Sequence, residues 1–542
     1  MTDVQSDAAA QTPAGPAGSA SQAKSRRWFA VGLAVAISLH LASATFHILF
    51  GGLNVDEGFY GVAARAITQG ALPYRDFGYS QPPVLPFVNG AVMRLIGFGL
   101  VQQRSVNGLW GALALGLCAW LAARRTRPWV GLLMALAFSL WPPWMYFIHL
   151  GKAYALTSLA AAAAAWVFLE RPRRSLLFLS ALAALGIGCR LASAPYFLVL
   201  WLAALCDGGL PSLREALRAV AQLLGFLAIV FLPFWLLARE SMTFWVFQFH
   251  ALSLQHRDWY LGWTEIFLHT TACWIGLLVL LAVTLAKTTL RPWPRRPAIL
   301  AAAAVLALAT NLIPKGALAE YSVPFLLPLA LAIILVVADF ARAWSLSRRV
   351  VLVAALMATQ LGANPIGNII HTATLRGSAL SLCLPLAAPD YDFGLPKRSA
   401  RIRALVERLL PPGQFLIGPN LIPALETNRP VPRNLFMGPF SVTRELPAAS
   451  AGKLHLATDR DIAGYLQDPN VTLISFADRL ELNYGWSMPS FALPPEGLPP
   501  RWAPDVLREF VTVYKGGHYV LLARSEYLRS KGLAPENGAP GI

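Results

Sequence analysis

The stretch "GGLNVDEGFYGVAARAITQGALPYRDFGYSQPPV", residues 51–84, follows directly after the apolar run "WFAVGLAVAISLHLASATFHILF", residues 28–50. A run of this length is sufficient to cross the hydrocarbon core of a bilayer as a helix. The adjacent carboxylates Asp56 and Glu57 therefore stand a few residues beyond a predicted membrane edge, and Asp76 follows in the same loop. Acidic residues in this position require a structural or a chemical explanation.

The segment that begins with the two acids has the spacing of a short amphipathic helix. Gly70 is suited to end this helix, and Asp56 lies near its N-cap, a position that favours Asp. An N-cap alone does not require a second acid, nor does it account for the motifs "LPYRDF" and "QPP" that follow. Two interpretations of Asp56 therefore remain, a helix cap and a reactive group. The apolar face of the predicted helix consists of Phe59, Val62, Ala63, Ala66 and Ile67.

The composition of the whole chain is that of a polytopic membrane protein. Of its 542 residues, 56% are hydrophobic and 13% are charged, and the mean hydropathy is +0.52, whereas soluble domains carry about 25% charged residues. The net charge of +17 would suggest nucleic acid as a partner of a soluble protein. Here the basic residues lie in short clusters between apolar runs, as the positive-inside rule expects, so we expect membrane lipids and no nucleic acid as partners.

The apolar runs predict about eleven transmembrane helices. "KSRR" (24–27) ends an Ala-, Gly-, Ser- and Gln-rich segment, so residues 1–27 are predicted to be a disordered cytoplasmic tail. Five further basic clusters fall on the same side of the membrane as "KSRR", which places residues 370–542 outside. A cleaved signal peptide ending near "ASA" (42–44) is the alternative, and ten spans would keep the alternation. The predicted spans are 28–50, 104–123, 129–147, 152–169, 175–190, 193–206, 219–238, 264–286, 298–313, 321–338 and 349–367.

The C-terminal segment, 370–542, differs in character from the apolar part. Residues 398–420 have the pattern of a helix followed by a strand, and "VTLISF" (471–476) and "HYVLLAR" (518–524) are short strand-like runs separated by Pro-rich loops. We therefore predict a small α/β extracytoplasmic domain. It contains no evident catalytic constellation, and the preferred interpretation is a structural or acceptor-orienting lid.

Several function classes are disfavoured by what the sequence lacks. The five cysteines lie mostly in or at the ends of apolar runs, and their spacing forms neither a disulfide framework nor a zinc motif. The sequence contains no Walker loop, no Rossmann glycine pattern and no Ser-His-Asp signature. ATP hydrolysis by this chain is therefore not expected.

The first loop, "DEGFYGVAARAITQGALPYRDFGYSQPPV", resembles the first outer loop of GT-C glycosyltransferases. This superfamily contains the dolichyl-phosphate-mannose:protein mannosyltransferases and the bacterial aminoarabinose transferases. In these enzymes an acidic residue or pair opens the loop, a short helix follows, and "PY-x-D" and "PP" motifs precede the second span. "EYSVPFLLPLALAIIL" (320–335) is similar to a late "Y-x-x-P-x-x-x-P" span of the same families. Gln81 departs from the basic residue or His that relatives often carry before the two prolines.

The resemblance implies a transmembrane GT-C catalytic domain over residues 28–369, with its first outer loop at 51–103. It also implies transfer of a sugar from a polyprenyl-phosphate lipid to an acceptor, which is an envelope glycan, a lipid or a protein, outside the inner (plasma) membrane. Asp56 would be the base that takes the acceptor's proton, and Glu57 would orient it or bind the acceptor. The sequence identifies neither the sugar nor the acceptor. No cofactor is assigned, and a divalent metal stays open because some relatives use one and others do not.

The leaving phosphate requires cations or hydrogen-bond donors at the outer membrane edge. A basic residue at this edge can also have a purely structural role. Arg75 can pair with Asp76, and lysines can extend to lipid headgroups. Arg190 ends an apolar helix, where a charge usually faces a cavity. The predicted substrate-binding residues are Tyr60, Tyr74, Arg75, Asp76, Gln81, Lys152, Arg190, His250, His256, Arg257, Lys315, Glu320 and Tyr321.

Two other function classes fit a polytopic protein. A transporter or lipid flippase would show inverted repeats and broken helices in paired positions, and the sequence contains no repeated half. A noncatalytic scaffold whose outer segment binds a partner is the second alternative, and loss of activity without loss of partner binding in an Asp56 variant would argue against it.

Overall fold

The computed structural model describes residues 16–50, 53–170, 175–207, 209–250, 295–312, 319–340, 395–443, 446–476, 508–516 and 519–533. The predicted spans 264–286 and 349–367 lie outside the described residues, so the number of spans stays a prediction. Four described helices are long and apolar enough to cross a membrane, and five further apolar helices are shorter. The predicted multi-pass helical architecture is thus confirmed in its general form.

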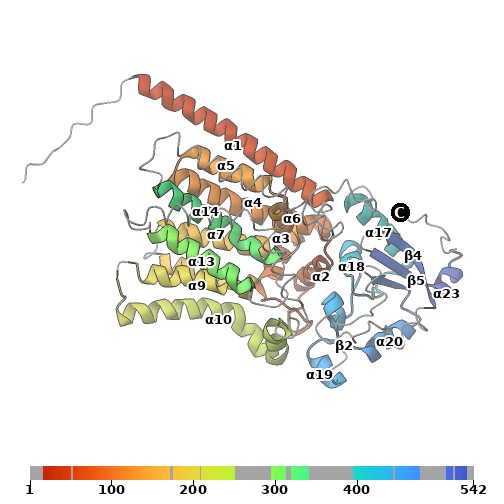
Figure 1. Cartoon of the computed structure of the whole chain (residues 1–542). Coiled ribbons are helices and arrows are strands. Elements are labelled where there is room, and N and C mark those ends of the chain that lie inside the picture. Colours follow the sequence, from red (N-terminus) through yellow and green to blue (C-terminus); the bar gives the residue numbers. More distant parts are fainter. Residues whose placement is uncertain are drawn as a thin grey trace, which may run out of the picture.

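The helices of the apolar part lie side by side as a bundle, with α2 at the end that faces the C-terminal segment (Figure 1). The bounds of these helices are α1 (Pro16–Phe50), α2 (Asp56–Thr68), α3 (Val84–Ile96), α4 (Leu100–Arg125), α5 (Pro128–Ser139), α6 (Pro142–His149), α7 (Tyr154–Glu170), α8 (Leu176–Cys189), α9 (Ala194–Leu205), α10 (Leu213–Thr243), α13 (Arg295–Leu312) and α14 (Val323–Phe340).

Three differences from the prediction go beyond a shift of a helix end within an expected span. α1 begins at Pro16, inside the predicted tail, because an Ala- and Gln-containing segment with Pro at its start can extend a helix. The predicted span 129–147 is divided into α5 and α6, since Pro142 and Pro143 follow the break and disfavour a continuous helix. α3 forms inside the stretch that was predicted to be loop, directly after Pro83.

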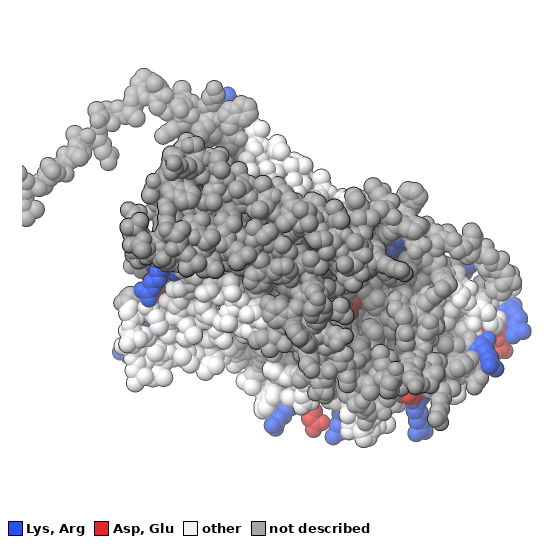
Figure 2. All heavy atoms as spheres, viewed as in Figure 1, with Lys and Arg blue, Asp and Glu red and all other residues white. Residues whose placement is uncertain are grey.

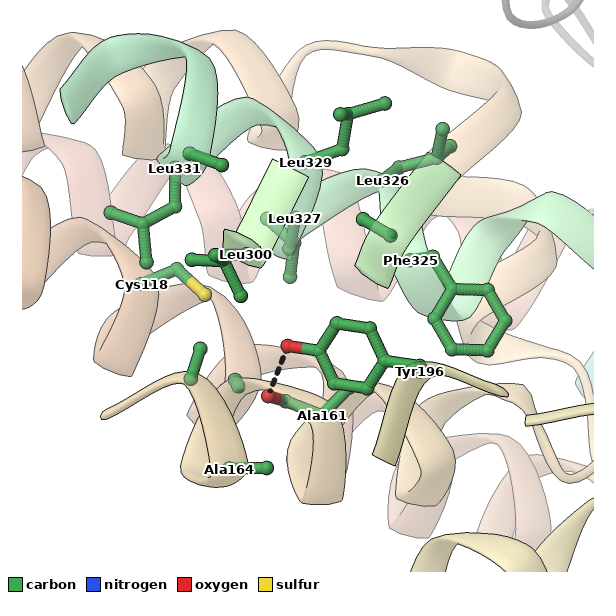
Figure 3. Close-up of a cluster of buried hydrophobic side chains, with 14 of the residues drawn as sticks. Cys118, Ala161, Ala164, Tyr196, Leu300, Phe325, Leu326, Leu327, Leu329 and Leu331 are labelled. Atoms are coloured by element: carbon green, nitrogen blue, oxygen red, sulfur yellow. Dashed lines mark hydrogen bonds between the residues drawn. The ribbon is translucent and has the colours of Figure 1, made fainter. Parts of the chain in front are cut away.

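Small residues allow the central helices to approach closely. In α7, residues Ala160 to Ala165 are almost all fully buried, and α7 packs against α4, α8 and α14. Alanine at such a contact lets helix backbones come together. The Tyr196 hydroxyl of α9 donates to the Ala161 carbonyl at 2.9 Å, as Figure 3 shows among the neighbouring leucines. The central helices are therefore closely packed next to the end of the bundle that carries α2.

The outer flank of the bundle is apolar. In Figure 2 the white surface in the left half of the molecule carries no coloured side chain between those at the left edge and those at the lower centre. Along α10 the exposed side chains include Leu224, Ile229 and Leu236, which are 58%, 71% and 68% exposed. Such a surface is suited to contact with lipid.

The described part of the C-terminal segment combines helices with two small sheets. The predicted strands at 471–476 and 518–524 are confirmed as β3 and β5, whereas the strand expected before residue 420 is reduced to one bridge between Ile417 and Ile474. That the segment lies outside the membrane stays a prediction. Its helices are α17 (Leu395–Leu409), α18 (Ile422–Thr427), α19 (Ala448–Lys453), α20 (Asp459–Gln467) and α23 (Ser525–Ser530). β1 (Val442–Thr443) pairs in parallel with β2 (Ala457–Thr458), and β3 (Leu473–Phe476), β5 (Tyr519–Arg524) and β4 (Phe510–Gly516) form an antiparallel sheet in that order.

Candidate active site

Asp56 is the first residue of α2, and its side chain does not cap the helix. The N-cap position is Val55, and no side-chain capping bond is present. The Asp56 backbone amide instead donates to the Asn54 side-chain oxygen at 3.1 Å. The interpretation of Asp56 as a helix cap is therefore wrong, and its carboxylate is available for another role. At the other end, Gly70 has a φ of +90° just after the helix, as predicted for a terminating glycine.

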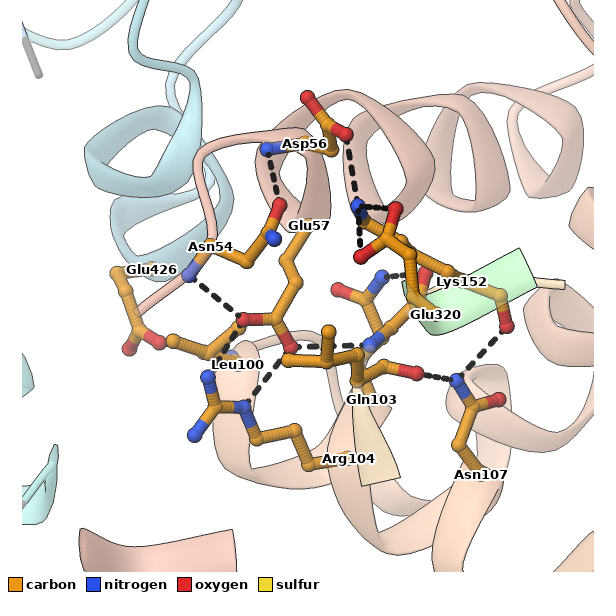
Figure 4. Close-up of polar contacts among 12 residues, drawn as sticks. Asn54, Asp56, Glu57, Leu100, Gln103, Arg104, Asn107, Lys152, Glu320 and Glu426 are labelled. Atoms are coloured by element: carbon orange, nitrogen blue, oxygen red, sulfur yellow. Dashed lines mark hydrogen bonds and ion pairs between the residues drawn. The ribbon is translucent and has the colours of Figure 1, made fainter. Parts of the chain in front are cut away.

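The Asp56 carboxylate belongs to a small cluster of charged groups (Figure 4). Lys152 Nζ lies 2.8 Å from Asp56 Oδ2 and 2.9 Å and 3.1 Å from the two carboxylate oxygens of Glu320. The Tyr154 hydroxyl donates to Glu320 Oε1 at 2.7 Å. The side chains of Lys152 and Glu320 are 3% and 7% exposed, whereas that of Asp56 is 30% exposed. Asp56 is thus the most solvent-exposed of these three charged side chains.

Glu57 points away from Asp56 and is completely buried against Arg104. Arg104 Nε donates to Glu57 Oε1 at 2.8 Å, and Arg104 Nη2 donates to Glu57 Oε2 at 2.5 Å. The backbone amide of Gly151, the residue before Lys152, donates to Glu57 Oε1 at 2.9 Å. Glu57 therefore joins α2 to α4 and to the turn that carries Lys152. Both carboxylate oxygens of Glu57 are therefore occupied by protein donors.

Arg190 lies beside the same cluster, with its guanidinium between two tyrosine rings. Its central carbon is 4.3 Å from the ring centre of Tyr321 and 5.2 Å from that of Tyr154. Its Nη2 is 3.4 Å from the Asn311 side-chain oxygen, and its Nε is buried without a hydrogen-bond partner in the described part of the chain. Arg190 is 7% exposed and is therefore buried at the end of α8, while its expected role toward a substrate stays a prediction.

Tyr60, one turn after Asp56, is buried next to these groups. Its ring makes an edge contact with that of Tyr79, at 6.1 Å between centroids. Burial raises the pKa of the Tyr60 phenol, and the charges of Lys152 and Asp56 act on it in opposite directions. The phenol therefore stays protonated at neutral pH and is available as a hydrogen-bond donor at the edge of the cluster.

The "LPYRDF" motif builds a tight turn and makes no described contact with Asp56. Tyr74 adopts a φ of +66°, its amide donates to the Phe77 carbonyl at 2.8 Å, and its hydroxyl donates to the Gln81 carbonyl. Asp76 Oδ2 accepts from Arg75 Nη2 at 2.7 Å and from the Leu72 amide at 2.8 Å. The hydrogen bond from Arg75 lowers the pKa of the Asp76 carboxyl. The structural interpretation of the Arg75–Asp76 pair agrees with this geometry.

Of the four remaining predicted residues, the structure describes only His250. His250 Nε2 lies 2.5 Å from the Ser80 carbonyl oxygen, next to the "QPP" motif. His256, Arg257 and Lys315 lie outside the described residues. In the described ranges no group of three or more His, Cys, Asp or Glu side chains is arranged to hold a metal ion.

Three residues of this neighbourhood, Arg104, Tyr154 and Asn311, were not predicted from the sequence. Arg104 was the first residue of a predicted span, and an arginine that enters an apolar span usually pairs with a buried acid. An ion pair of Arg104 with Glu57 or Asp56 could therefore have been predicted from its position in the sequence. Tyr154 and Asn311 lie in runs whose other residues are nearly all apolar, and sequence spacing alone does not show that they meet Glu320 and Arg190.

Comparisons with known proteins give structural matches. No family model matches the sequence, and no match among curated proteins was found. The crystal structure of ArnT from Cupriavidus metallidurans bound to undecaprenyl phosphate matches with a TM-score of 0.58 and 16% identity, over 92% of this chain and 98% of that one. The structure of the same ArnT in the apo state matches with a TM-score of 0.57 and 15% identity, over the same shares.

A weaker likeness is to the archaeal oligosaccharyltransferase AglB from Archaeoglobus fulgidus, in complex with an inhibitory peptide and a dolichol-phosphate. It has a TM-score of 0.44 and 13% identity, over 91% of this chain and 74% of that one. ArnT is an aminoarabinose transferase and so belongs to one of the groups that the first loop resembles. The chain therefore has the fold of the ArnT structures, which confirms at the level of the fold its resemblance to the GT-C glycosyltransferases.

Proposed function

We propose that this protein transfers a sugar from a polyprenyl-phosphate lipid to a hydroxyl group of an envelope glycan, a lipid or a protein. The ArnT fold supports this proposal, since one of the ArnT structures holds undecaprenyl phosphate. The reaction would take place at the outer face of the inner (plasma) membrane. The alternation of basic clusters along the sequence supports this side.

The observation that carries the proposal is the arrangement of the Asp56 carboxylate. One oxygen is held by Lys152 at 2.8 Å, and the other points away from the cluster in Figure 4. Because the side chain is 30% exposed and does not cap α2, an acceptor hydroxyl can reach it. A carboxylate placed in this way can act as a general base, which typically contributes about 10²–10⁴-fold to the rate.

In the proposed step, the acceptor oxygen forms a bond to the anomeric carbon while its proton passes to Asp56. The bond from that carbon to the phosphate oxygen breaks, and its electron pair leaves with the lipid phosphate. Lys152 pairs with Asp56, and Arg190 contacts the ring of Tyr154 in the same cluster, so these two cations could stabilise this charge. Lys152 already neutralises parts of Asp56 and Glu320, whereas Arg190 makes no ion pair with a described carboxylate. Arg190 is therefore the proposed contact of the phosphate.

The variant Asp56→Asn tests the base directly. It keeps the size of the side chain, and Lys152 keeps both hydrogen bonds to Glu320, so the protein should fold normally. Transfer should fall by ~10²-fold or more. The readout is the envelope or lipid-linked glycan that disappears when the gene is deleted, measured by mass spectrometry after complementation with each variant.

Asp207→Asn is the matched control. Asp207 is 23% exposed and pairs with Arg296 at 3.0 Å, just beyond the end of α9 opposite to Arg190, so the same substitution breaks an ion pair of similar exposure. This variant should restore the glycan fully. Near-normal transfer by Asp56→Asn would exclude Asp56 as the base and with it the proposed mechanism.

A further inference from the structure

A short segment of the C-terminal part, 421–429, packs against both the first turn of α4 and the helix that carries Asp56. It contains α18 and is separated from Asp56 by more than 360 positions in the sequence. We propose that this segment holds α2 in its reactive position, with Arg65 and Glu426 as positioning residues. This inference rests on the proposed function, because the group that is positioned is Asp56.

Arg65 ties α2 to the end of α18. Its side chain is buried, and it donates from Nη1 to the Ala424 carbonyl and from Nη2 to the Arg429 carbonyl, both at 2.8 Å. Asn428, with a φ of +55°, turns the chain so that both carbonyls face the guanidinium. Arg65 makes no ion pair with a described carboxylate, so these carbonyls replace the water that burial removes. A planar guanidinium is suited to this two-point contact, and an ammonium is not.

Glu426 ties the same segment to α4. Its Oε1 accepts a hydrogen bond from the Leu100 amide at 2.7 Å, which is one of the free amides at the start of α4. Arg403 lies 3.6 Å from its Oε2, and the Glu426 side chain is 3% exposed. A carboxylate stabilises the start of a helix both by accepting from a free amide and by its charge. The start of α4 is the turn that carries Arg104, the partner of Glu57.

Two glycines of α2 let α18 approach the first turns of the helix. A Cβ atom added at Gly58 would lie 2.8 Å from the Ile422 amide nitrogen and 2.9 Å from the Leu421 carbonyl carbon. A Cβ at Gly61 would collide with the side chains of Leu425 and Gln103. The backbone of 421–422 therefore rests directly on the turn that begins with Asp56, and a shift of α18 must move that turn or open a gap.

These contacts form a closed set among three helices. α18 is bonded to α2 through Arg65 and to α4 through Glu426, and α4 is bonded to α2 through the Arg104–Glu57 pair. Arg65 follows Asp56 by nine positions, about 13 Å along a helix, so it does not touch the reacting groups. Arg65 therefore affects the reaction indirectly, by fixing the position of the helix α2 that carries Asp56. The C-terminal segment thus takes part in the catalytic scaffold, beyond the lid role expected from its sequence.

The test is the kinetics of Arg65→Gln, Arg65→Lys and Glu426→Gln in the full-length protein, with the substrate identified by the glycan assay. Each should lower kcat by about 10- to 100-fold, since a shift of about 1 Å in a reacting group can cost that much. KM for the lipid donor should stay within about twofold, because the proposed phosphate contact, Arg190, lies outside this set. Arg65→Lys should be nearly as impaired as Arg65→Gln. Arg460→Gln, an exposed change on α20, is the matched control and should leave kcat unchanged.

Combination with Asp56→Asn separates a positioning role from general damage. If Arg65 acts through Asp56, Arg65→Gln should cost little further activity in the Asp56→Asn background. Hydrogen exchange of residues 56–68 should also become faster in Arg65→Gln. If an Arg65 variant does not fold, Gly58→Ala shifts the same contact without removing a charge and should show the same kinetic pattern.

Two outcomes would overturn the inference. One is normal kcat in all of these variants while Asp56→Asn is inactive. The other is an equal loss from Arg65→Gln in the parent and in the Asp56→Asn background. Near-normal transfer by Asp56→Asn alone would instead contradict the proposed function, so the two failures can be told apart.

Discussion

The buried pair of Glu57 and Arg104 leads to a prediction about stability that separates the two adjacent acids. The side chains are 0% and 1% exposed, respectively, so neither charge is solvated by water in the folded protein. Removing one partner of such a pair leaves an uncompensated buried charge and typically costs about 3–5 kcal/mol. Glu57→Gln should therefore destabilise the protein by about this amount, whereas Asp56→Asn should be almost neutral in stability.

The hydrogen bonds around Glu57 explain why glutamine is a poor replacement despite its equal size. The two carboxylate oxygens accept from Arg104 Nε, Arg104 Nη2 and the amides of Gly151 and Asn54. An amide group has one oxygen and one NH₂ group, so one pair of these donors would face another donor. Loss of the hydrogen bond from the Gly151 amide would also disturb the position of Lys152, because Gly151 directly precedes it.

The assay is unfolding of the purified protein in detergent, followed by tryptophan fluorescence, for Glu57→Gln, Arg104→Gln and the double variant. Each single variant should be strongly destabilised. The double variant should lose clearly less than the sum of both, since no charge is left without its partner. Single variants as stable as the parent, or an additive double variant, would refute the assignment of this pair as a structural tie between α2 and α4.

Two further predictions follow from the described contacts. Asp76 has a lowered pKa because it accepts a hydrogen bond from Arg75, so its contribution to the stability of the 72–77 turn is present above the usual Asp range and is lost as pH falls through the lowered value. Thermal unfolding of the parent and of Asp76→Asn should differ at pH 7, and the difference should shrink progressively as pH falls below the usual Asp range; a difference that does not change with pH would contradict the assigned cause. Arg190→Ala should raise KM for the lipid donor by about 10- to 100-fold, since a hydrogen bond to a charged group contributes about 1.5–3 kcal/mol. Unchanged donor kinetics would move the phosphate contact to other residues.

Much of the architecture was predictable because it depends on short stretches of sequence. Apolar runs form helices in this structure since a helix bonds its own backbone and places the apolar side chains outside. The helix after Asp56, its end at Gly70, and strands β3 and β5 were likewise predicted from local patterns. α3 was missed because its short apolar run lies between the motifs of the loop, and the division of α5 from α6 was missed although Pro142 and Pro143 mark it.

Several residues of the candidate site were also predicted from the sequence. Asp56 was named from the first loop, Lys152 and Arg190 as cations on the outer side, and Glu320 opens the motif at 320–335. The structure brings these four side chains into one neighbourhood. The partners of each were not predicted. Lys152 and Glu320 are 168 positions apart, and nothing in either local sequence specifies the other.

What the sequence by itself determined is therefore the membrane architecture and the acid-rich loop at its edge, since hydrophobic runs and turn residues act on their own neighbourhood. Only the tertiary structure decided that Asp56 faces Lys152 rather than capping its helix, that Glu57 is committed to Arg104, and that 421–429 rests on α2. These outcomes depend on which buried charges find partners when distant segments pack. A buried charge is costly unless it is paired, and the pairing is set by the shape of the packed helices.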